Sequence, residues 1–321
     1  MKIPFSPSVY EHAARWVERS PWDVSRDAEL LFEGHRRAYQ EYGHAPIVVG
    51  IDLYNLEAEA YGAEVTHPEG DGIPAINEPM FQTLEAALGL PGYDPARDGR
   101  IAMVIDVGKR LARELPEADV RIPVAGPFSI AINLRGITSL CEDLALQPLE
   151  VGTWLMELAE NQAGFCQAVV DAGLDVAFFE SAASPPMLSP RQFHEVELPA
   201  LKRIIAVTEE KVGHPVPCIM GGDTILILDD LLSTGTGFLV CNVETDQRAF
   251  IARAGATHPQ VKIRVNMDPG IVAGDSREAI HREIDRILEI AANHPNCLMG
   301  TGCLPLETPP ENVRWIREYV S

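Results

Sequence analysis

The sequence has no long uninterrupted hydrophobic run, although 46% of its 321 residues are hydrophobic and its mean hydropathy is -0.01. A membrane-spanning helix needs about 18 or more consecutive apolar residues, so we expect no membrane span and no membrane partner. The first residues, Met1 to Pro7, also lack the apolar segment and small-residue cleavage site of a signal peptide. We therefore expect a cytoplasmic protein.

Positive charge is scarce, because 26 lysines and arginines stand against 47 aspartates and glutamates, a net charge of -21. Such an acidic surface repels phosphate backbones, so we expect no nucleic-acid partner. Several short motifs are missing as well. No Gly-x-Gly-x-x-Gly turn, Gly-x-Ser-x-Gly elbow, His-x-x-x-His pair or Cys-x-x-Cys pair occurs. These absences argue against a dinucleotide-binding fold and a serine hydrolase.

Cysteine is too sparse for a disulfide framework, with six residues in a chain of this length. Four of them lie in apolar surroundings and are interpreted as small core residues: Cys141, Cys166, Cys241 and Cys297. The other two, Cys218 and Cys303, each end a short strand-like segment. Two thiols at strand ends favour a shared metal over a disulfide.

The chain alternates short apolar runs with helical patterns, which indicates a parallel sheet. Buried strands are predicted at Ala45–Ile51, Arg121–Ala125, Leu174–Glu180, Val216–Met220, Gly237–Asn242, Val261–Asn266 and Cys297–Gly300. Helices are predicted at Leu53–Tyr61, Pro148–Ala172, Pro190–Lys211, Ile225–Leu232, Asp246–Ala254, Ser276–Ala292 and Pro310–Tyr319.

This pattern predicts an α/β fold, a (β/α)8 TIM-type barrel, as one domain over residues 1–321. The eighth strand is expected within residues 64–120, and residues 1–44 are expected to form a helical extension outside the barrel. An open doubly wound sheet is the alternative, but the glycine-rich turn that it needs after the first strand is missing. A homodimer is compatible with the sequence, which does not fix the oligomeric state.

Polar residues at the predicted strand ends form the candidate site, because chemistry in such barrels gathers at the carboxyl ends of the strands. We select three as catalytic candidates: Asp52, Asp246 and Asn266. Asp246 and Asn266 each belong to a paired polar motif that follows a strand. Such motifs either bind a substrate or hold a loop through Asx turns.

Glu180, Cys218 and Cys303 are the candidate metal ligands, since a catalytic zinc typically has three protein ligands and one open position. Glu180 follows two phenylalanines, so its charge is poorly solvated and needs a partner. A metal would provide one. The alternative is that both thiols are buried core residues, while Glu180 caps the helix that begins near Ser189 or pairs with an arginine.

With these motifs collected, the chain resembles the uroporphyrinogen decarboxylase superfamily, which also contains zinc-dependent, corrinoid-linked methyltransferases. The resemblance covers roughly residues 45–319, and the family fold is a (β/α)8 barrel. It rests on five motifs in the family's order: Ala125-Gly-Pro-Phe-Ser129, Leu188-Ser-Pro190 with Phe193, Cys218-Ile-Met-Gly-Gly-Asp-Thr224, Asn266-Met-Asp-Pro269, and Gly302-Cys303 with Thr308-Pro-Pro-Glu-Asn-Val313.

The departures from the decarboxylase pattern favour the methyltransferase branch. Decarboxylases carry an Arg-Gln-Ala-Gly-Arg segment whose arginines hold substrate carboxylates, whereas residues 49–59 here contain no arginine. They also place a histidine near the last strand, where this chain has Cys303, which matches the zinc thiolate of the methyltransferases. The branch's His-x-Cys-Gly motif is altered to Cys218-Ile-Met220-Gly221. A thioether is a poor zinc ligand, which favours Glu180 as the third ligand.

The resemblance therefore implies a methyltransferase component of a corrinoid-dependent system. Zinc would activate a small O-methyl or N-methyl substrate, and the methyl group would pass to cobalamin or another corrinoid. The chain lacks an Asp-x-His-x-x-Gly corrinoid motif, so the corrinoid would be carried on a partner protein. A metal-independent decarboxylase-like lyase and a non-catalytic small-molecule-binding barrel are the alternatives.

Overall fold

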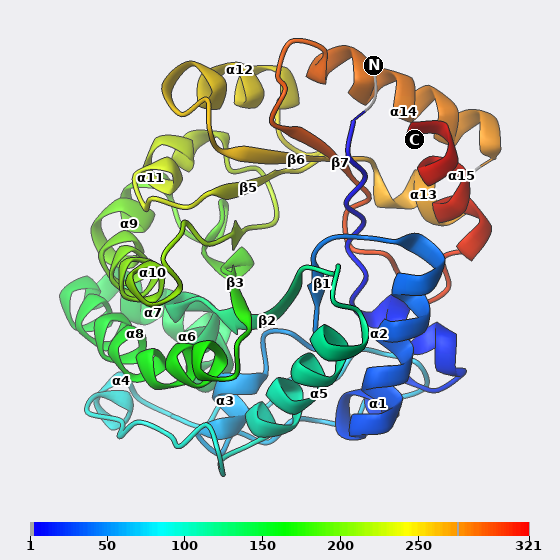
Figure 1. Cartoon of the computed structure of the whole chain (residues 1–321). Coiled ribbons are helices and arrows are strands. Elements are labelled where there is room, and N and C mark those ends of the chain that lie inside the picture. The colour runs from blue at the N-terminus through cyan, green and yellow to red at the C-terminus, as the bar shows by residue number, and fades with distance from the viewer. Residues whose placement is uncertain (1–2, 275, 321) are drawn as a thin grey trace.

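Seven parallel strands form the centre of this computed structural model, which describes residues 3–274 and 276–320. Strands β1 to β4 pair in chain order, β5 to β7 form a second run, and a bridge between Pro217 and Phe238 joins the two runs. The sheet therefore curves round in chain order, as Figure 1 shows. The strands are β1 (Ile47–Val48), β2 (Val120–Ala125), β3 (Asp175–Phe179), β4 (Cys218–Ile219), β5 (Phe238–Cys241), β6 (Lys262–Asn266) and β7 (Cys297–Gly300).

The described part of the N-terminal segment occupies the eighth position of the barrel, between β7 and β1 (Figure 1). Phe5 and Ser8 form parallel bridges to Met299 and Cys303. On the other side, Ser6 Oγ donates a hydrogen bond to the carbonyl oxygen of Ala45, 2.8 Å away. This position was expected to come from residues 64–120, where the only isolated β-bridge among the described residues is antiparallel, between residues 66 and 75.

The prediction that residues 1–44 lie outside the barrel is therefore wrong for the first described residues and right for the helices that follow. Prolines 4 and 7 obscure the strand because proline cannot donate to a ladder of hydrogen bonds. Beyond Tyr10, the chain forms η1 (Glu11–Val17), α1 (Pro21–Arg26) and α2 (Ala28–Tyr42), with α2 packed on η1 and α5. The N-terminal segment thus reaches the carboxyl ends of the strands before it leaves the barrel.

Helices surround the sheet on its outer side (Figure 1). No helix within residues 3–274 and 276–320 is both long and apolar enough to span a bilayer. The remaining helices are α3 (Leu56–Ala60), α4 (Leu84–Ala87), α5 (Ile101–Glu114), α6 (Pro127–Arg135), α7 (Ile137–Leu146), α8 (Pro148–Asp171), η2 (Ser181–Ala183), α9 (Pro190–Gln192), η3 (Phe193–Glu197), α10 (Leu198–Val212), η4 (Ile225–Ile227), α11 (Leu228–Leu232), α12 (Gln247–Thr257), α13 (Pro269–Gly274), α14 (Arg277–Ala291) and α15 (Pro310–Val320).

Local sequence explains where several of these helices begin. Ser189 Oγ accepts a hydrogen bond from the backbone N–H of Gln192 at 3.2 Å, and the Gln192 side chain accepts one from Ser189 N–H at 3.1 Å. This capping box starts the helical stretch that was predicted from Pro190 onward. Ser276 caps α14 in the same way through the N–H of Ala279.

Strand residues alternate between two separate apolar cores. In the register of β3 and β4, Phe178 pairs with Cys218 and Phe179 pairs with Ile219. Phe178 and Cys218 belong to the outer core, which lies between the sheet and the helices. Phe179 and Ile219 belong to the inner core, a small cluster within the barrel that also contains Tyr10, Val48, Leu53, Ala177, Phe238 and Val240. Successive side chains of a strand point to opposite faces, so β3, β4 and β5 each contribute to both cores.

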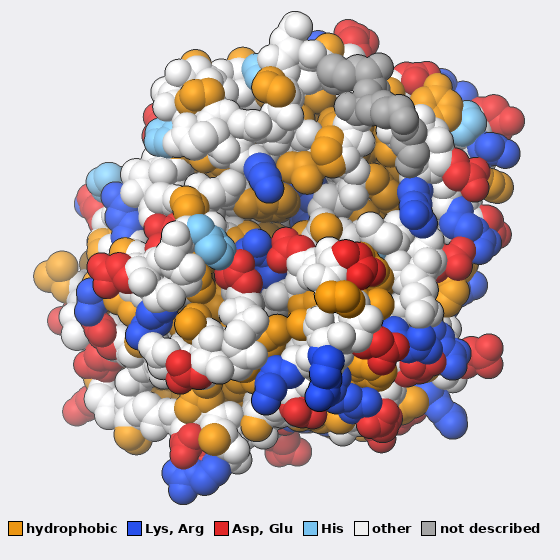
Figure 2. All heavy atoms as spheres, viewed as in Figure 1, with side chains coloured by type: hydrophobic (Ala, Val, Ile, Leu, Met, Phe, Trp, Pro, Cys, Tyr) orange, Lys and Arg blue, Asp and Glu red, His pale blue; other side chains and the backbone are white. Residues whose placement is uncertain are grey.

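The surface carries charge of both signs despite the net charge of -21. Figure 2 shows acidic and basic side chains spread around the rim of the face that Figure 1 views, with hydrophobic side chains visible near its centre. Many of these charges are paired on the surface, as in Arg203 with Glu160 and Arg248 with Glu289. Exposed pairs of this kind typically contribute less than about 1 kcal/mol each to stability.

Candidate active site

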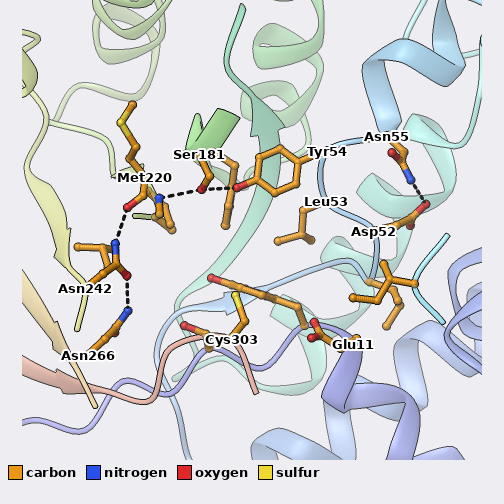
Figure 3. A pocket seen from close by; sticks show the side chains of 18 of the residues that line it. Glu11, Asp52, Leu53, Tyr54, Asn55, Ser181, Met220, Asn242, Asn266 and Cys303 are labelled. Carbon is orange, nitrogen blue, oxygen red and sulfur yellow. Dashed lines mark hydrogen bonds between the residues drawn. The ribbon is translucent and has the colours of Figure 1, made fainter. Parts of the chain in front are cut away.

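A cavity of about 280 Å³ lies at the carboxyl ends of the strands, inside the barrel. Its walls come from the ends of β3 to β6, from the loops after β1 and β7, and from the N-terminal segment (Figure 3). It is lined by Ser8, Tyr10, Glu11, Ile51, Asp52, Leu53, Tyr54, Asn55, Ile73, Pro74, Phe179, Ser181, Ile219, Met220, Gly221, Val240, Asn242, Arg264, Asn266 and Cys303. The cavity lies where a barrel enzyme carries its active site.

Asp52 lines the cavity, but its carboxylate is fully engaged with the protein. Arg100 donates to both oxygens, at 3.0 Å to Oδ1 and 2.6 Å to Oδ2, and Asn55 Nδ2 donates to Oδ2 at 3.0 Å. Arg100 also donates to Glu59 Oε2 at 2.6 Å. Burial lowers the pKa of Arg100, but the neighbouring carboxylates of Asp52 and Glu59 outweigh burial, and the pKa is raised. Asp52 therefore fixes the loop after β1, and a catalytic role for it stays a prediction.

Asn266 ends β6 and reaches the cavity beside Asn242. Asn242 Nδ2 donates to the carbonyl oxygens of Met220, at 3.0 Å, and Gly222, at 3.2 Å, so its Oδ1 is left to accept. Asn266 Nδ2 donates to that Oδ1 at 2.9 Å (Figure 3). This chain of bonds leaves Asn266 Oδ1 without a partner, although it is buried. The side chain is thus held in one orientation with a free acceptor.

Tyr54 and Ser181 form a second polar link across the cavity wall (Figure 3). The Tyr54 hydroxyl donates to Ser181 Oγ at 2.6 Å, and Ser181 Oγ also accepts from the backbone N–H of Gly221 at 2.8 Å. Burial raises the pKa of Tyr54, so the hydroxyl keeps its proton near neutral pH. The link joins the loops that follow β1, β3 and β4.

Cys303 is an exposed thiol in the cavity wall, directly after the Gly302 turn. Protein atoms around the sulfur take water away from it, and this raises the pKa of Cys303 to about 11; Glu11 adds to the rise and Arg264 opposes it. The thiol is therefore protonated at neutral pH unless a cation or a base approaches it. The structure thus places Cys303 in the lining of the cavity.

Glu11 was missed by the sequence reasoning and lines the same cavity, near Cys303 in Figure 3. No lysine, arginine or histidine among the described residues pairs with its carboxyl group. Burial, with a smaller contribution from Glu307, raises the pKa of Glu11 to about 7. A carboxyl group whose pKa lies near neutral pH is suited to donate or accept a proton.

Glu180 and Cys218 lie outside the cavity lining, in the outer layer. Glu180 Oε1 accepts from the N–H of Ser129 at 2.9 Å and from its hydroxyl at 3.1 Å. Its Oε2 lies where a Cβ on Gly126 would be, 1.4 Å from the ideal position. Burial raises the pKa of Glu180 to about 8, and burial also raises the pKa of Cys218.

The predicted zinc ligands are therefore not brought together. Glu180 and Cys218 are completely buried on the outer side of the sheet, whereas Cys303 lies on the inner side. Within the described part of the chain, no group of three or more histidine, cysteine, aspartate or glutamate side chains has an arrangement that could hold a metal ion. These residues do not fit a three-ligand zinc site, and no catalytic step is derived through one.

Asp246 is also absent from the cavity lining. It is exposed, and its Oδ1 accepts from the backbone N–H of Ala249 at 3.1 Å, which caps the start of α12. The sequence left two roles open for this motif, substrate binding and holding the local backbone. The observed contact is of the second kind. A catalytic role for Asp246 has no support in this geometry.

Tyr10 and Arg264 are two further cavity residues that the sequence reasoning missed. Arg264 carried a readable signal, because it is a charged residue between the apolar residues Ile263 and Val265 of a predicted buried strand. Tyr10 and Glu11 had none, since the segment that contains them was expected to lie outside the barrel. Their place in the site follows from the eighth position of the sheet.

Comparison with known proteins supports the fold and the family. A family model described as uroporphyrinogen decarboxylase (URO-D) matches residues 2–321. The uroporphyrinogen decarboxylase of Roseiflexus sp. strain RS-1 is 27% identical over 93% of this chain and 86% of its own length. A chloroplastic uroporphyrinogen decarboxylase 2 of Oryza sativa subsp. japonica is 30% identical over 93% of this chain and 80% of its own length.

A solved structure of a methyltransferase from Methanosarcina mazei shares the fold. It superposes with a TM-score of 0.83 at 19% identity and covers 99% of this chain and 94% of the other. The predicted barrel and the predicted superfamily are both confirmed. The family-model match spans nearly the whole sequence, from the N-terminal segment that fills the eighth position to the last helix. The chain belongs to the uroporphyrinogen decarboxylase family.

Proposed function

We propose that this chain is the methyltransferase component of a corrinoid-dependent system, which moves a methyl group from a small O-methyl or N-methyl substrate to a separate corrinoid protein. The observation that carries the proposal is the cavity: about 280 Å³, largely apolar, with one thiol and one near-neutral carboxyl group. Pockets for drug-sized ligands typically run from about 300 to 1,000 Å³, so this one suits a smaller molecule than a tetrapyrrole.

The walls supply what a small methylated substrate needs. Leu53, Phe179 and Ile219 belong to the inner core and present an apolar surface for the methyl-bearing part. The Methanosarcina mazei protein with the same fold is called a methyltransferase, and the family also contains the decarboxylases named above. The absence of arginine in residues 49–59 and the presence of Cys303 near the last strand favour the first of these two activities.

Glu11 is the proposed general acid. The carbon–oxygen or carbon–nitrogen bond of the substrate breaks with its electron pair left on the heteroatom, and Glu11 delivers a proton to that atom. A bound corrinoid would supply a reduced cobalt centre that takes the methyl group. With a pKa of about 7, roughly half of the Glu11 carboxyl groups carry the proton at pH 7. The thiol of Cys303 lines the same cavity and contacts the bound substrate in this scheme.

The corrinoid is proposed to arrive on a partner protein, because the chain lacks an Asp-x-His-x-x-Gly motif. The partner would meet the chain at the carboxyl ends of the strands, which form the side of the barrel that holds the cavity. The predicted zinc ligands do not assemble, so proton transfer by Glu11 is the activation that the described side chains support. Zinc analysis of the purified protein, before and after Cys303→Ser, tests metal activation independently.

The test is a reconstituted methyl transfer. The full chain is mixed with a corrinoid protein reduced to the cob(I)amide state and a panel of small methyl ethers and methylamines, and the absorption of methylcobamide is followed. We expect its formation to require the chain and to fall at least about tenfold in Cys303→Ser, because a substrate contact is lost. Release of carbon dioxide from a carboxylated substrate, with no methyl transfer to the corrinoid, would instead support the lyase alternative.

A further inference from the structure

Three buried hydrogen-bond donors of the cavity lack a partner within the protein. Ser8, Tyr10 and Arg264 expose only 2%, 5% and 3% of their surfaces. The Ser8 hydroxyl, the Tyr10 hydroxyl and the Arg264 Nε all lack a hydrogen bond among the described residues. All three residues line the cavity. A buried polar group without a partner costs about 1–3 kcal/mol, so three of them together in one cavity call for a ligand.

Arg264 is the most costly of the three, because a buried arginine is almost always paired with a carboxylate. Here no aspartate or glutamate within residues 3–274 and 276–320 forms an ion pair with Arg264. Its guanidinium carbon lies 5.7 Å from the centroid of the Phe238 ring, which gives it a cation–π contact but no counter-ion. The charge is therefore held inside the barrel without a protein partner.

The charge of Arg264 acts on the cavity side of the barrel. Arg264 also borders a second hollow, at the amino ends of the strands, which it shares with Arg121 and Lys262. The groups that respond to its charge, however, lie in the cavity: burial raises the pKa of Tyr10 and of Cys303, and Arg264 lowers both. Ser8 and Arg264 both lie close enough to the Tyr10 hydroxyl to lower its pKa by polar interaction, although none of the three makes a hydrogen bond of standard geometry with another. The three donors therefore lie together.

Gly300 on β7 makes room for this arrangement. A Cβ at Gly300 would lie 2.7 Å from Arg264 Cγ and 2.2 Å from Asn266 Oδ1. Both distances are far below van der Waals contact, so a side chain at Gly300 would push Arg264 and Asn266 aside. The glycine lets the arginine lie against the adjacent strand, inside the barrel. The position of the unpaired guanidinium is therefore built into the fold.

We propose that Arg264, Tyr10 and Ser8 form a binding site for the carboxylate of the substrate, which is thus a small anionic molecule. The donor set fits this group, because arginine can only donate and its planar fork matches the two oxygens of a carboxylate. A cation has no place beside the guanidinium. The inference deepens the proposed function, on which it rests, by adding an acidic group to the methylated substrate.

The experiment measures equilibrium binding of two matched probes to the full chain by titration calorimetry. Methoxyacetate carries a methyl ether and a carboxylate, and methoxyacetamide is its uncharged counterpart of nearly the same shape. We expect saturable binding of methoxyacetate, and binding of the amide that is weaker by about 10-fold or more, because hydrogen bonds to a charged group are the stronger class. The measurement needs no corrinoid protein and no turnover.

Two variants test the assignment to these residues. Arg264→Gln removes the charge and should weaken methoxyacetate binding about 10- to 100-fold, with no loss of thermal stability in the ligand-free protein, since an unpaired buried charge disappears. The control, Arg203→Gln, makes the same change in an arginine that is 50% exposed and should leave binding unaltered. If Arg264→Gln does not fold, Tyr10→Phe removes only a hydroxyl and keeps the ring against Phe179, 5.6 Å away.

Tyr10→Phe should weaken methoxyacetate binding by about 3- to 10-fold. Equal affinity of the wild type for the acid and the amide would overturn the proposal. So would unchanged binding of the acid in the folded variants, or no saturable binding of methoxyacetate by the wild type. Carboxylate binding without methyl transfer would refute the proposed function and leave the site standing. Methyl transfer from neutral substrates alone would refute the carboxylate site and leave the proposed function standing.

Discussion

Cys218 in β4 and Cys303 in the loop after β7 were both predicted as thiols at a strand end, and the fold places them in opposite environments. Cys218 is completely buried in the outer core, on the side of the sheet away from the cavity. Cys303 is exposed and lines the cavity. The same contrast holds for two carboxyl groups, because Glu180 packs against the first turn of α6 while Glu11 faces the cavity.

The position of each residue in its strand decides whether its side chain lies in the outer core or on the inner side of the barrel. Phe178 and Cys218 pair across β3 and β4 and point outward, whereas Phe179 and Ile219, one residue later, point inward. A shift of one residue reverses the side of the sheet. In a barrel both sides are buried, so an apolar run does not reveal which of its residues face the cavity.

The largest expected effect is on catalysis by Glu11. In the proposed function, Glu11→Gln removes the general acid and should lower the rate of methyl transfer by about 10²- to 10⁴-fold at pH 7. In the wild type the rate should fall as the pH rises above about 7, because the protonated carboxyl group is lost. The assay is methylcobamide formation across a pH series.

Glu195→Gln is the matched control, since Glu195 is an exposed carboxylate that pairs with Arg191. It should keep the wild-type rate and pH profile. Glu180→Gln, in the outer layer, should also leave the pH profile of the rate unchanged. A rate for Glu11→Gln within a factor of about two of the wild type would remove Glu11 from the mechanism.

The second largest expected effect is on stability, and it concerns the packing of the outer core at Gly126. Gly126→Ala places a methyl group 1.4 Å from Glu180 Oε2, and the carboxyl group has to leave its bonds to Ser129. We expect the free energy of unfolding to fall by about 2–4 kcal/mol, measured by urea denaturation.

Gly164→Ala is the control on α8, where an added Cβ meets nothing within 4 Å. Because alanine has the higher helix propensity, this variant should be more stable than the wild type by about 0.5–1 kcal/mol. Equal stability of the two variants would show that Glu180 does not hold the position described for it.

The sequence predicted the architecture better than the site. Six of the seven strands lie within ranges predicted from apolar runs, and β2 begins one residue before its predicted range, because a parallel strand with helices outside it is largely apolar. The segment at Phe5 was missed, since its two flanking prolines hide a strand that pairs at isolated points. Within the site, the inward or outward direction of Cys218 depends on register, which no local pattern contains.

A smaller effect is expected from the pH dependence of Glu180. Its pKa is about 8 in the folded protein, so between pH 4.5 and about 8 the folded state holds a proton that the unfolded chain releases. The stability of the wild type should therefore fall as the pH rises through this window. Glu180→Gln cannot titrate, so its advantage over the wild type should grow by about 1–3 kcal/mol between pH 5 and pH 8.

Urea denaturation at the two pH values measures this difference. A metal held by Glu180 and Cys218 would reverse the sign, because Glu180→Gln would then lose a ligand and destabilise the protein at pH 8. The zinc content of Glu180→Gln and Cys218→Ser should likewise equal that of the wild type. A loss of zinc in both variants would restore the ligand set that the sequence suggested.

The smallest of these effects concerns the hydroxyl of Tyr54. Tyr54→Phe removes one hydrogen bond, to Ser181 Oγ, and keeps the ring against Phe179 at 6.1 Å between centroids. We expect a loss of about 1 kcal/mol in the free energy of unfolding. Ser181→Ala leaves two partly buried donors unpaired, the Tyr54 hydroxyl and the N–H of Gly221, and should cost more.

The contrast between the two thiols is tested most directly by their alkylation rates in the native protein. The folded chain is treated with iodoacetamide at pH 8, and the modified cysteines are identified by mass spectrometry over time. Cys303 should react at least about tenfold faster than Cys218, because only Cys303 is accessible from the cavity. Equal rates, or faster modification of Cys218, would contradict the assignment of the cavity side of the barrel to the site.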